Sequence, residues 1–172
     1  SGLGVVSRAF QPANVGARVD WSPEFIAAHA GQPLKAVALT IERRRVRGEA
    51  MVTRYGLEGG AVYALGPQLR QALEREEAAR LYVDLRPTET ADALAARLSK
   101  TPSSQSRANR LRRAARLRPV EAALLRQAPP LPADADDRTL AERLKGVPLV
   151  ITGLQGLDRA ISSAGGVDLA AL

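Results

Sequence analysis

Apolar and polar residues alternate in several short segments of the first half of the chain, a pattern typical of half-buried β-strands. Residues 34–41 and 46–53 both show it, and three arginines at positions 43–45 separate them. Two such segments on either side of a short charged turn predict an antiparallel pair. The same alternation at residues 80–86 predicts a further strand.

Short helices are expected between these strands. Ser22, Pro23 and Glu24 form a typical helix start, with a side-chain cap, a proline in the first turn and an acid at the positive end of the helix dipole. This helix is expected to end by Gly31. A second helix is expected to begin at Gly66-Pro67 and to run to about residue 77.

Helical spacing of apolar residues replaces alternation after Pro87. A turn at residues 101–104 and a Pro/Ala/Asp linker at 128–137 divide this region. The expected helices lie at residues 91–98, across the arginine-rich segment, from Pro119 onward, and around Leu140 and Leu144.

The strand pattern returns after Gly146, at residues 147–152. Gly153 and Gly156 then predict a turn into a last helix that ends at residues 163–166. Such a turn either seats an anion on the helix N-terminus or only permits tight backbone geometry.

This order predicts an α+β fold, with a small, mostly antiparallel β-sheet or barrel into which a helical subdomain is inserted. Residues 1–86 and 146–172 form the expected β-rich subdomain, and residues 87–145 form the helical one.

Composition narrows the chemistry. The 172 residues include no cysteine, which excludes disulfides, thiol catalysis and cysteine-ligated metals. No apolar run is long enough for a membrane span and no signal peptide is visible, so we expect a cytoplasmic protein without a membrane partner. His29 lacks the sequence context of a triad, and Asp134, Asp136 and Asp137 lack the pattern of a calcium loop, so no metal site is expected.

The net charge of +7 comes from one segment, residues 97–118, which holds eight basic residues and no acidic one. At helical spacing its arginines leave a narrow apolar gap at Ala108, Leu111 and Ala115. Such a helix is either a solvated face or a surface for phosphates or an acidic partner. Arg107, Arg110 and Arg113 are the candidate anion-binding residues.

A glycine-dense segment follows the second strand and is the candidate ligand-facing loop. Three glycines in five positions can bring bare backbone N–H groups against a ligand, although a plain turn into a short helix explains them equally well. Its residues are Tyr55, Gly56, Leu57, Glu58, Gly59 and Gly60.

Three stretches of the chain together resemble one family. They are residues 11–16 with Asp20-Trp21-Ser22, residues 47–65 with the Gly48-Glu49 and Thr53-Arg54-Tyr55-Gly56-Leu57-Glu58-Gly59 signatures, and residues 161–167 with Gly165-Gly166-Val167. The sequence is similar to the YhiN-like, or aminoacetone-oxidase-like, group of predicted FAD-dependent flavoproteins. Val15 departs from the family, where cysteine is expected to be common.

The resemblance implies an insert domain that interrupts a two-part flavin-binding domain of the Rossmann type. This sequence lacks the family's N-terminal Gly-x-Gly-x-x-Gly unit, so FAD is expected in the parent protein and not on this chain. The implied partners are the flavin-binding domain of the same parent chain and a small-molecule substrate. By this analogy the segment 55–60 faces the flavin or the substrate, and Asn14 and Tyr63 line the pocket.

Three functions remain open on the sequence. The first is a substrate-covering domain of a flavin-dependent oxidoreductase, inactive alone. The second is a nucleic-acid-binding module that uses residues 97–118, although no aromatic residue beyond position 82 is present for base stacking. The third is a protein-interaction domain that uses the basic helical face, for example in dimerisation.

Overall fold

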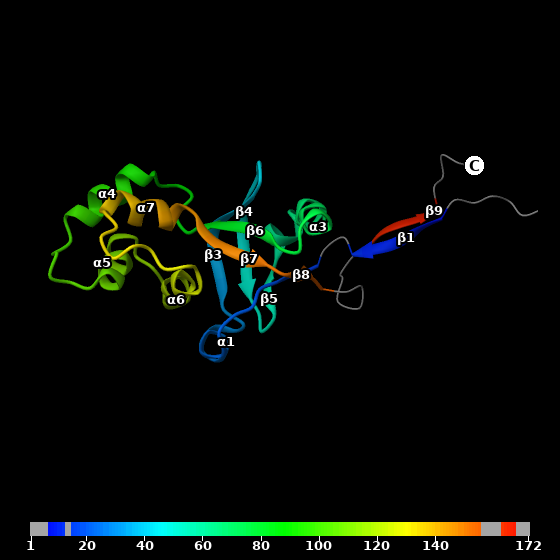
Figure 1. Cartoon of the computed structure of the whole chain (residues 1–172), viewed down its shortest axis with the longest axis horizontal. Coiled ribbons are helices and arrows are strands. Elements are labelled where there is room, and N and C mark those ends of the chain that lie inside the picture. Colours follow the sequence, from blue (N-terminus) through cyan, green and yellow to red (C-terminus); the bar gives the residue numbers. More distant parts are fainter. Residues whose placement is uncertain (1–6, 13–14, 156–162, 168–172) are drawn as a thin grey trace, which may run out of the picture.

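The computed structural model of the chain describes residues 7–12, 15–155 and 163–167 (Figure 1). An antiparallel sheet of seven strands occupies the centre of the view, and four helices gather at one end of it. The fold is therefore α+β, as the sequence predicts. Its strands, in sheet order, are β7 (Val147–Ile151), β6 (Ala79–Asp84), β3 (Pro33–Ile41), β4 (Arg44–Val52), β5 (Gly56–Glu58), β2 (Ala17–Arg18) and β8 (Gly153–Leu154).

The β3–β4 hairpin confirms the expected antiparallel pair, but its turn is shorter than predicted. Ile41 pairs with Arg44, so the turn consists of Glu42 and Arg43 alone. Glu42 adopts a φ of 51°, which lets the chain reverse within these two residues. Arg44 and Arg45 belong to β4, where their exposed side chains fit a strand end at the surface.

The two outermost strands of the sheet belong to one continuous segment. β7 and β8 are separated only by Thr152, whose N–H donates to the carbonyl of Arg18 at 3.0 Å. The segment thus pairs with β6 at one edge of the sheet and with β2 at the other. This double pairing requires the sheet to curl like the wall of a barrel.

Three helices accompany the sheet: α1 (Pro23–His29), α2 (Gly60–Tyr63) and α3 (Gly66–Arg75). α1 begins as predicted, because the Ser22 hydroxyl accepts the N–H of Phe25. The ring of Phe25 packs against the ring of Trp21, with their centroids 4.8 Å apart.

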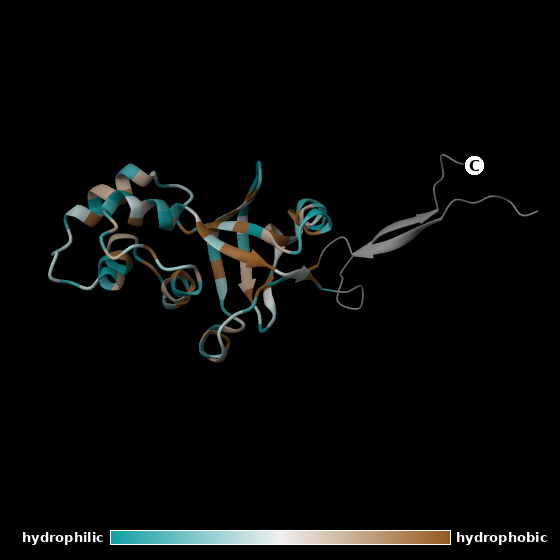
Figure 2. Ribbon diagram, viewed as in Figure 1, coloured by the Kyte–Doolittle hydropathy of each residue, from teal (hydrophilic) through white to brown (hydrophobic). Residues whose placement is uncertain are grey.

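The helical subdomain contains α4 (Ala91–Ser99), α5 (Arg107–Ala114), α6 (Pro119–Gln127) and α7 (Asp137–Lys145). α4 and α7 lie side by side and bury leucines between them (Figure 1). The buried side chains of the sheet and of these helices form a single apolar cluster. Figure 2 shows its hydrophobic residues along β6 and β7, whereas hydrophilic ones cover much of the helices.

The basic segment 97–118 is not one helix. It spans the end of α4, the whole of α5 and the residue that caps α6. Arg116 has a φ of 50°, a left-handed conformation that breaks the helical path after Ala114. Leu111 and Ala115 are buried as expected, but Ala108 is exposed and Ala114 is buried instead.

The expected last helix is wrong for its final residues. Ser163–Val167 form strand β9, which pairs antiparallel with β1 (Ser7–Pro12). Residues 156–162, the rest of that predicted helix, lie outside the described residues. Pairing with β1 and two adjacent glycines, which are poor helix formers, favour the extended conformation. Gly153 likewise begins strand β8 and not a turn.

No helix in the described part of the chain combines the length and the apolar character that a membrane span requires.

Candidate functional site

The predicted ligand-facing loop is held inside the sheet. Gly56–Glu58 form β5, which pairs with β4 on one side and with β2 on the other. Gly56 is buried with a φ of 154°, and a Cβ added there would lie 1.9 Å from the carbonyl oxygen of Ala17. This glycine therefore permits contact with the protein's own backbone, which takes the place that a ligand would need.

Hydrogen bonds fix the backbone on either side of Gly56. The indole Nε1 of Trp21 donates to the Gly56 carbonyl at 3.2 Å, and the N–H of Val19 donates to the Tyr55 carbonyl at 2.9 Å. The Tyr55 hydroxyl donates to the Glu58 carboxylate. The segment is thus rigidly tied to residues 16–21.

The Tyr55 ring lies over Gly16. A Cβ on Gly16 would be 2.5 Å from the Tyr55 hydroxyl oxygen, so the ring occupies the space beside this glycine. The Gly16 carbonyl in turn accepts the N–H of Gln155 at 3.0 Å. Tyr55 therefore lies beside the residue that precedes β2, and this residue bonds to the one that follows β8.

The other candidates of this segment differ in exposure. Leu57 is fully buried in the core. Glu58, Gly59 and Tyr63 are half-buried, and Gly60 is exposed. These four and the half-buried Tyr55 present surface to a ligand, and Asn14 lies outside the described residues.

The candidate anion-binding arginines do not act as a group. Arg107 donates to the carbonyls of Pro132 and Ala133, and Arg110 donates to Asp137 at 2.6 Å. Both guanidinium groups therefore hold the helical subdomain together. Arg113 is exposed, together with Arg112 and Arg116, and none of these three forms an ion pair with a described residue.

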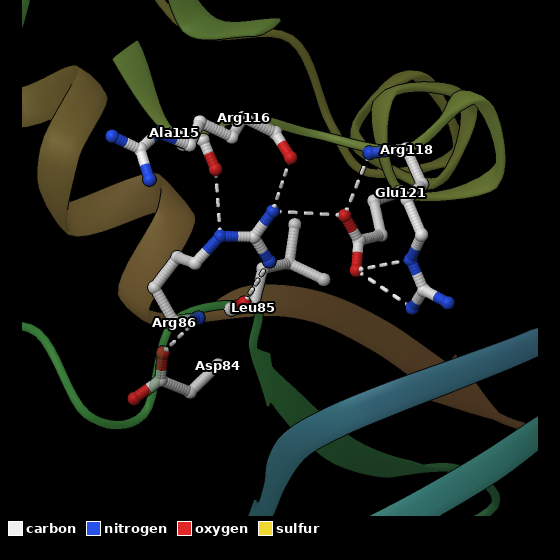
Figure 3. Close-up of polar contacts among 7 residues, drawn as sticks. All are labelled: Asp84, Leu85, Arg86, Ala115, Arg116, Arg118 and Glu121. Carbon is white, nitrogen blue, oxygen red and sulfur yellow. Dashed lines mark hydrogen bonds and ion pairs between the residues drawn. The ribbon is translucent and has the colours of Figure 1, made fainter.

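Two buried carboxylates, which the sequence analysis does not single out, organise the junction between the sheet and the helices (Figure 3). The guanidinium of Arg86 bonds to Glu121 at 3.0 Å and to the carbonyls of Ala115 and Arg116 at 2.6 and 2.8 Å. Burial acts to raise the pKa of Glu121, but hydrogen bonds from Arg86 and Arg118 outweigh it and hold the pKa below its ordinary value.

The second carboxylate is Asp84, at the end of β6. Its oxygens accept bonds from Arg45 at 2.6 Å, from Lys145 at 2.8 Å and from the N–H of Arg86 at 2.9 Å. It thus connects the β3–β4 hairpin to α7. A signal for Glu121 does exist in the sequence, since it is the one acidic residue between positions 93 and 133.

Neither His29 nor the aspartates near 136 form a metal site. The Nδ1 of His29 lies 3.1 Å from the side-chain oxygen of Gln32, and its ring packs against Phe25. Asp136 caps α7 by accepting the N–H of Thr139 at 2.7 Å, and Asp137 pairs with Arg110. Among the described residues no three His, Asp or Glu side chains gather as metal ligands would.

A curled antiparallel sheet, with helices α4 to α7 inserted between β6 and β7, defines a barrel-and-helix domain. A family model described as the HI0933-like protein barrel and H2TH domain matches residues 11–162. The chain belongs to this family, and the resemblance to the YhiN-like flavoproteins is thereby confirmed. No curated protein matches the chain significantly.

Proposed function

We propose that this chain is the insert domain of an FAD-dependent oxidoreductase, that it covers the flavin and the substrate there, and that it has no catalytic activity by itself. Membership of the HI0933-like flavoprotein family supports the oxidoreductase context. Hydride chemistry would come from FAD, while the surrounding protein binds and orients the substrate.

The pairing of the two connecting segments supports an insertion. β1 pairs with β9 and β2 pairs with β8, both antiparallel, so residues 7–12 run opposite to 163–167 and residues 17–18 run opposite to 153–154. An insert that leaves a host domain and returns to it needs its entry and exit segments close together, and these pairings bring them together. The observation that carries the proposal is the place of Tyr55 beside Gly16, whose carbonyl accepts the N–H of Gln155.

The surface beside these segments is the part of the domain that would face the host. Glu58 belongs to it, because it ends β5, which pairs with β2. Gly59, Gly60 and Tyr63 follow Glu58 directly in the chain and extend this surface along α2. Their role would be to bound the substrate space from one side and to exclude water from it.

The described residues of this chain do not fit FAD itself. The buried glycine approaches the backbone of Ala17, and a Cβ on Gly59 would lie 3.0 Å from the carbonyl oxygen of Glu49, so neither forms a cradle for a dinucleotide. We therefore assign the flavin to the host domain and derive no reaction step on this chain.

The test compares the 172-residue chain with the full-length protein that carries it. The chain alone should bind no FAD in an equilibrium titration followed by flavin fluorescence. In the full-length protein, Glu58→Gln and Tyr63→Phe should change kcat/KM with unchanged FAD content, and Gln71→Ala on α3 should change neither. Stoichiometric FAD on the chain alone, or unaltered kinetics in both variants, would refute the proposal.

A second candidate function, nucleic-acid binding, is favoured by one observation. Arg112, Arg113 and Arg116 are exposed close together, without ion pairs to described residues. Phosphate binding by this surface should weaken steeply with salt and should be lost in the triple arginine-to-glutamine variant. Arg110→Gln is no fair test, because it also breaks the Asp137 pair.

A further inference from the structure

A hollow of about 360 Å³ lies between α5, α6 and the linker that precedes α7. Most of its lining residues are apolar and form what we call its floor; they include Leu111, Leu117, Ala122, Leu125 and Leu131. This volume lies at the lower end of the range of about 300–1,000 Å³ that is typical of small-molecule sites. We call it the α5–α6 hollow.

Three arginines, Arg107, Arg126 and Arg143, stand at the rim of the α5–α6 hollow, and no acidic residue lines it. Other arginines of the helical subdomain form ion pairs with carboxylates: Arg110 pairs with Asp137, and Arg138 pairs with Asp92 and Glu142. Within residues 15–155 the three rim arginines have no such pair. The rim is therefore cationic without internal compensation.

Two of the rim arginines are held in place. Arg107 donates to the carbonyls of Pro132 and Ala133, and Arg143 donates to the carbonyl of Pro129 at 2.6 Å. These bonds fix the linker across the hollow and fix the guanidinium groups with it. A guanidinium has five N–H donors, so Arg143 keeps donors for a further acceptor.

Burial lowers the pKa of Arg143, and no neighbouring carboxylate acts to raise it. The cation thus loses hydration without gaining an anionic partner from the protein. A bound anion would supply that partner and would form charge-assisted hydrogen bonds with it.

We propose that the α5–α6 hollow binds a small organic carboxylate with an apolar body, whose tail lies on the leucine floor and whose carboxylate bonds to Arg143. The complementarity of an apolar floor and an uncompensated cationic rim argues for this ligand. A hollow of about 360 Å³ suits a small molecule better than a polynucleotide. This site is separate from the surface proposed to face the flavin, and it does not depend on that proposal.

The experiment titrates octanoate into the 172-residue chain by isothermal calorimetry, with octan-1-ol as the neutral probe of equal chain length. Octanoate should bind and octan-1-ol should bind at least about tenfold more weakly, because only the carboxylate forms a charged hydrogen bond. Arg143→Gln should lower octanoate affinity about tenfold. Arg113→Gln removes the same charge outside the hollow and should leave the affinity unchanged.

A second pair of variants tests the location by filling space. Ala108 is exposed and lines the hollow, so Ala108→Phe should fill it without disturbing the core and should abolish binding. Ala96→Phe, on the exposed face of α4, is the matched control. The proposal is overturned if millimolar octanoate does not bind, if octan-1-ol binds equally well, or if Ala108→Phe binds like Ala96→Phe. Circular dichroism checks that each variant is folded.

Discussion

Arg86 and Glu121 are separated by 35 positions in the sequence, yet the guanidinium Nη2 of Arg86 lies 3.0 Å from the Glu121 carboxylate. Arg86 lies two residues after the end of β6, and Glu121 lies in the first turn of α6. Glu121 is 1% exposed, and its carboxylate also accepts the backbone N–H of Arg118 at 2.8 Å. One buried carboxylate therefore connects the sheet, the turn after α5 and the start of α6.

Removing this carboxylate should be costly. Glu121→Ala leaves the Arg86 guanidinium without its anionic partner and the Arg118 N–H without its acceptor inside the protein. Breaking a buried pair on one side costs about 3–5 kcal/mol, so we expect a loss of that size in the free energy of unfolding in urea. Glu142→Ala removes an exposed carboxylate that pairs with Arg138 and should cost less than about 1 kcal/mol. Equal losses in the two variants would contradict a central role for Glu121.

The same carboxylate predicts a dependence of stability on pH. The pKa of Glu121 is lower in the folded chain than its ordinary value of 4.5. A carboxyl with a lowered folded pKa stabilises the protein above its unfolded pKa, and this stabilisation is lost as the pH falls through the folded pKa. The free energy of unfolding of the wild type should therefore decrease on acidification below about pH 4.5.

Glu121→Gln provides the control for this pH effect, because it keeps the shape of the side chain and removes its titration. Its stability should be lower at neutral pH and should decline less steeply between pH 5 and pH 2, measured by urea unfolding at each pH. Parallel pH profiles for the two proteins would assign the acid lability to other carboxyls.

The sequence predicts most elements because local signals set them. Ser22 begins α1, Thr90 caps α4, and the alternating residues of β3 and β4 pair as expected. The arginines are different, because their roles depend on distant partners. Helical spacing cannot tell that Arg110 meets Asp137, 27 positions away, while Arg113 stays exposed.

The glycines of the candidate loop show a second limit. A glycine that approaches a ligand and a glycine that approaches its own chain look the same in a sequence, because both positions require the absence of a Cβ. Only the structure shows that Gly56 pairs with Arg18 and lies against the carbonyl of Ala17. Glu58 and Tyr63, which are half-buried, stay predictions of a ligand-facing surface.

The contact between α1 and α6 should contribute modestly to stability. The side-chain oxygen of Gln127 accepts the backbone N–H of Ser22 at 3.0 Å, over 105 positions of sequence. Gln127→Ala leaves this N–H without its acceptor, and we expect a loss of about 1–2 kcal/mol in the free energy of unfolding. Gln71→Ala, on α3, is the control and should change stability by less than about 0.5 kcal/mol. A loss no larger than that of the control would show that solvent satisfies the Ser22 N–H equally well.

Gly56 should tolerate no side chain. In Gly56→Ala the new methyl group would meet the carbonyl of Ala17, the N–H that Val19 donates to Tyr55 and a backbone φ that disfavours L residues. Relief requires β2 and β5 to separate, which breaks their pairing and the bond from Trp21. We expect a loss of at least about 3 kcal/mol in the free energy of unfolding, measured in urea. The Trp21 fluorescence should shift toward that of a solvent-exposed indole.

Gly60→Ala is the matched control, since a Cβ there meets no atom within 4 Å, and its stability should stay within about 0.5 kcal/mol of the wild type. If Gly56→Ala unfolded with the wild-type midpoint, β2 and β5 would not pair as closely as the structure shows. The glycine would then be free to face a ligand.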